Sequence, residues 1–186
     1  MIDIIDYGPL QKLIGTWTGD KGLDIAPEPG GTEKNPYYET IVFTACEDVE
    51  NAESELLTFL HYRQIVQRKS NNKIFHDQTG YWMWNSNTKT VMHSFTIPRG
   101  VAILAGGLVN EKLSENSEVT LEVNAKVNDK NWGIIQSPFM QKNAKTIAFS
   151  QKLHIRNNQL SYTQTTSLEI YGRSFEHTDN NSLIKE

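Results

Sequence analysis

The sequence lacks the features that would place it in a membrane, in an oxidising compartment or on a nucleic acid. Its only cysteine is Cys46, so an internal disulfide is excluded, and we expect this residue to be a buried bystander. No apolar run reaches the roughly 18 residues of a membrane-spanning helix, and the N-terminus lacks the basic start of a secretory signal. With 18 Lys and Arg against 22 Asp and Glu, the net charge of −4 argues against nucleic-acid binding. We therefore expect a cytoplasmic protein that binds neither membrane nor nucleic acid.

Short catalytic and metal-binding motifs are also missing. The sequence contains no nucleophile elbow, no P-loop and no glycine-rich dinucleotide motif. No two of its histidines stand at a zinc-binding spacing; they are His61, His76, His93, His154 and His177. An enzyme that works without a cofactor is therefore the weakest interpretation, because no acid–base pair or nucleophile is recognisable.

What the sequence does have is a long series of β-strand patterns. Apolar and polar residues alternate with period two in residues 119–127, as they do in a half-buried strand. Aromatic and β-branched residues also fill residues 37–45, 57–66, 73–84, 90–97, 101–105, 146–155, 160–171 and a stretch after Ser174. Short turn signals separate these runs, and a helical pattern is limited to residues 6–13. The length of 186 residues suits one domain, residues 1–186.

This series predicts an all-β fold, an antiparallel up-and-down β-barrel of about ten strands with a short N-terminal helix, because closure removes exposed strand edges. The interior of such a barrel holds side chains or one small ligand. Two segments do not fit the strand pattern. Residues 21–35 are rich in Gly and Pro and predict a long loop, in which Asp24, Glu28 and Glu33 would be solvated rather than bind a cation. Residues 131–142 contain Pro138, which makes a continuous central strand unfavourable, and this segment could cover one mouth of the barrel.

Two aromatic motifs bear on the closed end of such a barrel. Gly15-Thr16-Trp17 follows the short helical segment, and it is the GxW signature of lipocalin-like and fatty-acid-binding-like barrels, in which the Trp plugs the closed end. A core Trp of any other β protein is the alternative. The run Tyr81-Trp82-Met83-Trp84 predicts core packing, with the wall of an apolar cavity as the alternative. The sequence leaves the oligomeric state open; an exposed strand or the Trp82 and Trp84 side chains could form the contact of a homodimer.

Longer stretches of the sequence resemble the nitrobindin family of haem-binding β-barrels. The resemblance runs over most of the chain, through LIGTWTG at 13–19, YYETIVF at 37–43, HDQTGYW at 76–82 and FEH at 175–177, with shorter words at 98–100, 144–146 and 160–163. The family motif is GxWxGxG, and here Lys21 stands at the third Gly while Gly22 comes one place later.

The resemblance implies a haem b cofactor and a set of site residues. It makes His177 the ligand to the haem iron and His76 a residue of the same pocket. Weaker candidates are Phe75, Ile97 and Thr166 for the pocket walls and Thr16 for the haem edge. It also implies nitric oxide binding and an enzymatic activity, the isomerisation of peroxynitrite to nitrate. A neutral imidazole facing into an apolar barrel is a sound axial ligand for iron.

A second interpretation keeps the barrel and changes its ligand. The same fold could carry a fatty acid or another apolar small molecule without catalysis. Such carriers usually hold the ligand's carboxylate with an inward Arg, and the candidates are Arg63, Arg68, Arg99 and Arg173. A buried Arg together with an outward-facing His177 would favour this interpretation.

Overall fold

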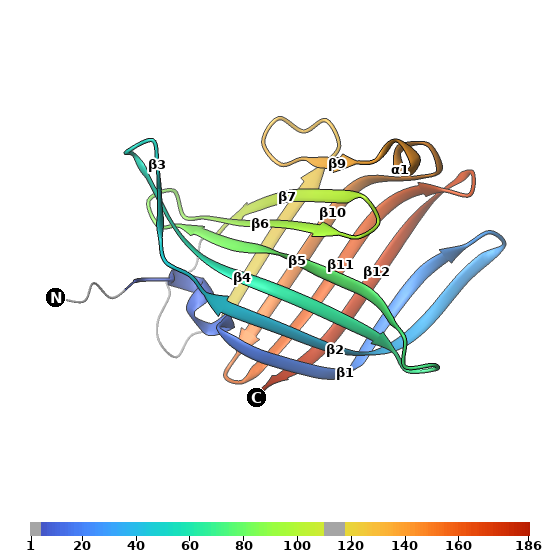
Figure 1. The fold of residues 1–186 in the computed structure, drawn as a ribbon, viewed down its shortest axis with the longest axis horizontal. Helices are drawn as coiled ribbons and strands as arrows, with labels where there is room; N and C mark the ends of the chain where they lie inside the picture. Colours follow the sequence, from blue (N-terminus) through green and yellow to red (C-terminus); the bar gives the residue numbers. More distant parts are fainter. Residues whose placement is uncertain (1–4, 110–117) are drawn as a thin grey trace.

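The computed structural model describes residues 5–109 and 118–186, and it forms a closed antiparallel β-barrel (Figure 1). Ten strands make the wall, in chain order: β1 Gly15–Glu28, β2 Gly31–Ala45, β4 Glu55–Arg68, β5 Ile74–Asn85, β6 Thr90–Ile97, β7 Val101–Leu108, β8 Val119–Lys126, β10 Ala144–Arg156, β11 Gln159–Ile170 and β12 Arg173–Lys185. Two short strands, β3 Val49–Asn51 and β9 Ile134–Gln136, pair beside β4 and β7. The barrel closes because β1 pairs with β12 and β2 pairs with β4. The predicted fold class is confirmed.

The N-terminal helical segment closes one end of the barrel. It is a 3-10 helix, η1 Gly8–Leu13, whose Leu10 and Leu13 side chains are buried. Trp17 is fully buried, and its indole Nε1 donates a hydrogen bond to the Leu13 carbonyl at 2.6 Å. Trp17 therefore plugs this end, as the GxW motif predicts.

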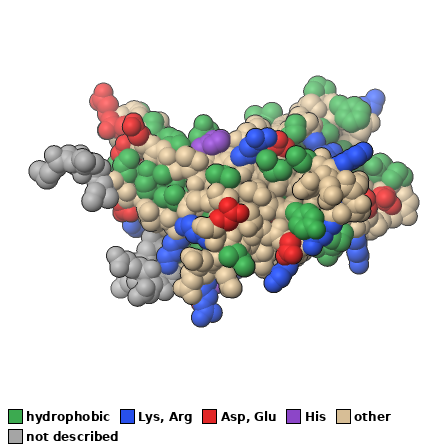
Figure 2. All heavy atoms as spheres, turned by 60° about the horizontal axis from the view of Figure 1, so that its bottom comes forward, with side chains coloured by type: hydrophobic (Ala, Val, Ile, Leu, Met, Phe, Trp, Pro, Cys, Tyr) green, Lys and Arg blue, Asp and Glu red, His purple; other side chains and the backbone are tan. Residues whose placement is uncertain are grey.

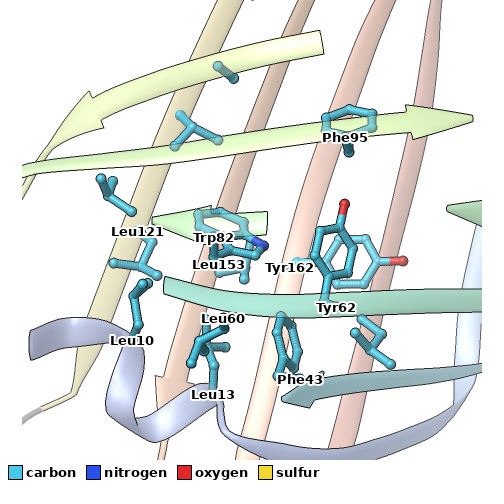
Figure 3. Packing of buried hydrophobic residues seen from close by; sticks show 14 of the residues in the cluster. Leu10, Leu13, Phe43, Leu60, Tyr62, Trp82, Phe95, Leu121, Leu153 and Tyr162 are labelled. Atoms are coloured by element: carbon cyan, nitrogen blue, oxygen red, sulfur yellow. The ribbon is translucent and has the colours of Figure 1, made fainter. Parts of the chain in front are cut away.

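The apolar core begins next to η1 and continues on the β6, β7 and β10 side as far as Phe149, which is level with His177 across β11. Figure 3 shows Leu10, Leu13 and Leu60 close to Trp82, with Tyr62 and Tyr162 lying to one side of them. Alternation along each strand produces this packing; in β8, for example, Val119, Leu121, Val123 and Ala125 point inward and their neighbours point out. Burial of these side chains is the main contribution to the stability of the barrel.

The prediction of a loop at residues 21–35 is wrong. These residues extend β1 and β2 into a long hairpin that lies far from the N-terminal helix in Figure 1, with pairing from Gly22 opposite Tyr37 to Glu28 opposite Gly31. The Gly and Pro content predicts a loop, but tertiary contacts hold the segment as a hairpin. Strand β12 pairs along residues 23–25, and the Arg173 guanidinium donates a hydrogen bond to the Glu28 carbonyl at 3.1 Å. Pro is tolerated in strands near a sheet edge.

The segment at residues 131–142 extends the wall of the barrel, and its Trp132 and Met140 side chains pack against the apolar core. That it covers one mouth stays a prediction. Strand β9 extends the sheet beside β7. The Gln136 side chain exchanges two hydrogen bonds with the backbone of Thr146, the third residue of β10. Pro138 then begins helix α1 Pro138–Asn143, with Ser137 as its N-cap. The expectation that Pro138 prevents a continuous central strand is confirmed.

The outer surface carries charges of both signs. On the face in Figure 2, basic and acidic side chains are scattered over the strands without a field of one sign. Trp82 and Trp84 are buried, so the suggestion that they form a dimer contact is wrong, whereas their core packing is confirmed. Cys46 is half-buried rather than buried. In the part of the chain that the structure describes, helices long and apolar enough to span a bilayer are absent.

Candidate functional site

The inner face of the barrel becomes polar in the half away from Trp17. The buried polar side chains that line it come from seven strands, and they are Asp24, Asn35, Glu39, Gln64, Gln78, His93, Gln151 and Asn181, with Gln164, His177 and Asp179 partly buried beside them. All occupy inward positions of the period-two alternation. A polar interior of this kind needs internal hydrogen-bond partners, because buried polar groups without them are costly.

His177 points inward from β12 and contacts two carboxylates. Its Nε2 lies 2.6 Å from Oδ1 of Asp24 on β1 and 3.6 Å from Oδ2 of Asp179 on β12. The Asp24 side chain is only 4% exposed, and its second oxygen, Oδ2, accepts a hydrogen bond from Asn35 Nδ2 at 2.8 Å. The expectation of a solvated Asp24 is therefore wrong, because the hairpin buries it.

The pKa values of His177, Asp24 and Asp179 are shifted in different directions by burial and by one another. Burial alone would lower the pKa of His177, but the hydrogen bond to Asp24 and the charges of Asp179 and Asp24 raise it above its usual value. Burial would raise the pKa of Asp24, yet its bonds to His177 and Asn35 lower it. For Asp179, burial and the nearby Asp24 charge raise the pKa against the opposing effect of His177. Asp24 and His177 thus form an ion pair with a second acidic group beside it.

His76 lies at the same end of the barrel and belongs to a separate chain of hydrogen bonds. Its Nε2 is 3.1 Å from Gln78 Oε1; Gln78 Nε2 donates to the Tyr62 hydroxyl, which lies 2.6 Å from His93 Nε2. Burial lowers the pKa of His76, and the charges of Arg99 and His177 lower it further. The electrostatic effect of His177 on His76 indicates that the two imidazoles share one end of the interior.

The other predicted site residues divide into two groups. Thr166 on β11 pairs directly with His177, and on its other side it pairs with Phe149 of β10. Phe75 lies at the irregularity between β4 and β5, with its ring 6.3 Å from that of Tyr37, and Ile97 ends β6, the strand that carries His93.

Thr16 is not brought to this end. It neighbours Trp17, which pairs with Lys185, whereas Asp24 pairs with Asp179 further along the same two strands. The structure therefore separates Thr16 from His177 by most of the length of the barrel.

A second buried network surrounds Glu39, which the sequence interpretation missed. Gln64 Nε2, the Tyr162 hydroxyl and Asn181 Nδ2 donate to the Glu39 carboxyl at 2.5, 2.9 and 2.6 Å. Tyr37 completes it, with its hydroxyl 2.8 Å from that of Tyr162. Burial raises the pKa of Glu39 to about 7, although these three donors act in the opposite direction. The alternation of YYETIVF could have identified it, because residues 37, 39, 41 and 43 share the inward face.

Four buried side-chain polar atoms lack a hydrogen-bond partner among the described residues. They are Thr58 Oγ1, Arg68 Nε, His93 Nδ1 and Gln151 Oε1. The His93 ring is held by stacking on Trp82, with centroids 4.2 Å apart, and burial lowers its pKa to about 3, so the ring is neutral. Neutral, fixed polar atoms of this kind can accept or donate a hydrogen bond to a small polar guest.

The outer wall carries a groove of about 570 Å³ that is separate from these networks. Outward-facing side chains line it, among them Thr79, Ser94, Leu104 and Ile135. It contains none of the predicted site residues. The chemistry of the molecule is concentrated inside the barrel, at the end where His177 and His76 lie.

Comparison with known proteins agrees with this architecture. The sequence profile of the family described as "THAP4-like, heme-binding beta-barrel domain" matches residues 6–185, nearly the whole chain. No match was found among curated proteins. Among solved structures, the crystal structure of Rv2717c from M. tuberculosis has a TM-score of 0.69 and 20% sequence identity, and the match covers 97% of this chain and 99% of that chain. At this identity the similarity shows the fold alone.

Proposed function

Because the chain belongs to the THAP4-like, heme-binding beta-barrel domain family, the nitrobindin family, we propose that its barrel binds haem b with His177 as the protein ligand to iron. The observation that carries the proposal is the inward position of His177 at the end of the barrel that also holds His76. Thr166, beside His177 on β11, and Phe149, one strand further on β10, would form part of the pocket wall.

The imidazole of His177 suits haem iron once Asp24 no longer shares a hydrogen bond with its Nε2. Iron binds the free nitrogen of a neutral imidazole, and Nε2 of His177 now shares a 2.6 Å hydrogen bond with Asp24. The carboxylate therefore has to leave Nε2, or the imidazole has to turn. The charges of Arg68 and Arg99 act on Asp24 and His177, so these two guanidiniums are the candidates that would pair with the propionates of a porphyrin.

In this proposal the bound haem supplies the chemistry for nitric oxide binding and for the isomerisation of peroxynitrite to nitrate, in the cytoplasm. The residues of the chain would hold the haem and shield it and its small ligand from water. His76, kept neutral by burial and held by Gln78, would offer a hydrogen bond to a small ligand bound at this end of the barrel. The strands of the barrel would limit the access of water to the haem, and this burial would affect the reduction potential of the iron.

The alternative, a fatty-acid carrier, has less support because the family that matches the chain is described as heme-binding. The acidic side chains of the interior do not separate the two ligands, since Asp24 would repel the carboxylate of a fatty acid and the propionates of haem alike. Arg63 points away, because it forms a two-pronged ion pair with Asp77, at 3.0 and 2.7 Å, with side chains that are 57% and 38% exposed. Arg68 does face inward: it stands opposite Tyr37 in the β2–β4 pairing, its guanidinium lies 4.9 Å from the centre of the Phe75 ring, and its Nε is buried. His177 faces inward as well, so the combination that would favour a carrier, a buried Arg with an outward His177, is only half present.

A titration of the purified protein with hemin, followed by visible absorption, tests the proposal. We expect a saturable Soret band at one haem per chain, lost in His177→Ala. His154→Ala is the matched control, because that imidazole lies on β10 with a side chain 40% exposed, and it should leave the titration unchanged. Absence of a saturable band, or a band that persists in His177→Ala, would overturn the proposal.

A further inference from the structure

We propose that Asp24, His177 and Asp179 form a binding site for a single divalent first-row metal ion, and that this site does not depend on haem. Within residues 5–109 and 118–186, these are the three His or Asp side chains whose ligand atoms all lie within 4.8 Å of one another. They come from two paired strands, since Asp24 is the register partner of Asp179 and His177 is the preceding inward residue on β12.

Two of the three distances between donor atoms are close to what one ion requires, and the third, between the Asp24 and Asp179 oxygens, is at most 4.8 Å. Two ligands bound to the same ion at about 2.1 Å lie roughly 3 to 3.4 Å apart. His177 Nε2 is 3.6 Å from Asp179 Oδ2 and 2.6 Å from Asp24 Oδ1. An ion between them would draw the first pair slightly together and separate the second, which needs only small side-chain rotations.

The surrounding residues hold the carboxylates as outer-shell residues do in metal sites. Asn35 Nδ2 donates to Asp24 Oδ2, so that Oδ1 is left facing His177. Gln164 Nε2 lies 3.5 Å from Asp179 Oδ2, and Gln164 is itself held by Gln151 at 3.2 Å. Partners of this kind orient metal ligands and raise affinity.

Charge also favours a cation at this position. Two carboxylates face one imidazole in the barrel, and Glu39 adds a third acidic group that acts on Asp179. The charges of Arg68 and Arg99, which act on Asp24 and His177 respectively, oppose a cation here, so the carboxylates have to outweigh them. An imidazole with two carboxylates is a donor set for Zn²⁺, Mn²⁺ or Fe²⁺ rather than for the all-oxygen sites of Ca²⁺ and Mg²⁺.

Three protein ligands leave a coordination position free for water or a small oxygen-donor ligand, as in catalytic rather than structural metal sites. The site also has a consequence for haem. His177 has one Nε2, so a metal ion and haem iron would exclude each other. Bound Zn²⁺ should therefore weaken hemin binding, and hemin should displace Zn²⁺.

Calorimetric titration of the chelator-treated full chain with zinc sulfate tests the site. We expect one Zn²⁺ per chain, with affinity reduced at least 10-fold in Asp179→Asn and in Asp24→Asn and lost in His177→Ala. Glu176→Gln is the matched control, because it removes one negative charge from the exposed face of the same strand. Thermal unfolding of each variant shows whether it is folded, and the two Asp variants serve as independent tests should one unfold.

Each outcome separates this proposal from the haem proposal. Zinc binding that is absent, or that is unaffected by both Asp variants and His177→Ala, overturns the metal site. Asp179→Asn should still bind hemin, because the ligand to iron would be Nε2 of His177 and not the Asp179 carboxylate. Hemin binding without zinc binding therefore refutes the metal site alone, and zinc binding without hemin binding refutes the haem proposal alone.

Discussion

Asp24 and His177 are 153 positions apart in the sequence, and their Oδ1 and Nε2 atoms are 2.6 Å apart in the barrel. The pairing of β1 with β12 produces this contact, because it sets Asp24 opposite Asp179 and diagonal to His177. A hydrogen bond between charged groups contributes about 1.5–3 kcal/mol. The imidazole is therefore fixed in orientation, and its Nε2 is already hydrogen-bonded to Asp24.

The first prediction concerns the cost of freeing that nitrogen. Asp24→Asn keeps the shape of the side chain but removes its charge, so the bond to His177 Nε2 becomes weaker. We expect hemin to bind roughly 10-fold more tightly to this variant, since about 1.4 kcal/mol corresponds to a factor of ten. Absorption titrations of wild type and variant at one pH would measure the ratio of dissociation constants.

Glu176→Gln is again the control, because it alters a carboxylate on the outer face of β12. It should leave the hemin dissociation constant unchanged. Weaker hemin binding by Asp24→Asn would contradict the prediction and would mean that the carboxylate supports the imidazole in the complex instead of competing with iron.

The sequence patterns alone were sufficient for the fold, whereas the role expected of His177 came from the family resemblance. Alternation with period two reports which side chains face inward, and turn residues report where strands end. The barrel of about ten strands, the Trp17 plug and the buried Trp82 follow from these local signals. They depend on near neighbours in the chain, which a single sequence displays directly.

The polar partners of His177 depend instead on pairing between distant strands. Gly and Pro in residues 21–35 indicated a loop, and a loop gives no register, so nothing set Asp24 opposite Asp179. Asp179 itself could have been found, because residues 177, 179 and 181 alternate inward on one strand. The hairpin is specified by contacts with β12 and Arg173, which are long-range tertiary contacts.

The second prediction concerns Glu39 and the pH dependence of stability. Its pKa is about 7 in the folded barrel and about 4.5 when the carboxyl is free, so the folded state binds more protons between these values. Stability should therefore fall as pH rises from about 4.5 to about 7, by on the order of 3 kcal/mol at about 1.4 kcal/mol per pKa unit. Glu39→Gln should remove this slope.

Buried His93 acts in the opposite sense, which makes the comparison of variants necessary. Its pKa is lowered to about 3, so the folded state binds fewer protons and stability is lost as pH falls below about 6.5. The two effects partly cancel in the wild type. Urea unfolding at pH 5 and pH 8 should show that Glu39→Gln gains stability relative to wild type at pH 8. An identical pH slope in both proteins would contradict the role of Glu39.

The third prediction concerns the shifted glycine of the GxWxGxG motif. Between Gly19 and Gly22, β1 contains one more residue than β2, and a bulge takes it up. Gly22 thereby takes an inward position under the ring of Tyr37, and a Cβ at residue 22 would overlap that ring. Tyr37 cannot yield freely because it is buried and its hydroxyl contacts that of Tyr162. Gly22→Ala should destabilise the barrel by about 1–3 kcal/mol.

Urea unfolding measures this cost, and Gly30→Ala is the matched control, because a Cβ there meets open space at the tip of the same hairpin. The control should stay within about 0.5 kcal/mol of wild type. Equal stability of the two alanine variants would show that the bulge does not require a glycine under Tyr37.

The last prediction separates the stability of the closed end from the function of the open one. Trp17 is fully buried against η1, and its Nε1 bonds to the Leu13 carbonyl, so Trp17→Ala leaves a cavity and an orphaned carbonyl. Unfolding free energy should fall by about 3–5 kcal/mol. Ile184→Ala, on the exposed end of β12, should change it by less than about 0.5 kcal/mol.

The pair of strands that carries Trp17 and Lys185 at one end carries Asp24 and Asp179 further along. Hemin and Zn²⁺ affinities measured well below the unfolding temperature should therefore match wild type in Trp17→Ala. A loss of either affinity in the folded variant would mean that the plug, and not only the open end, shapes the binding site.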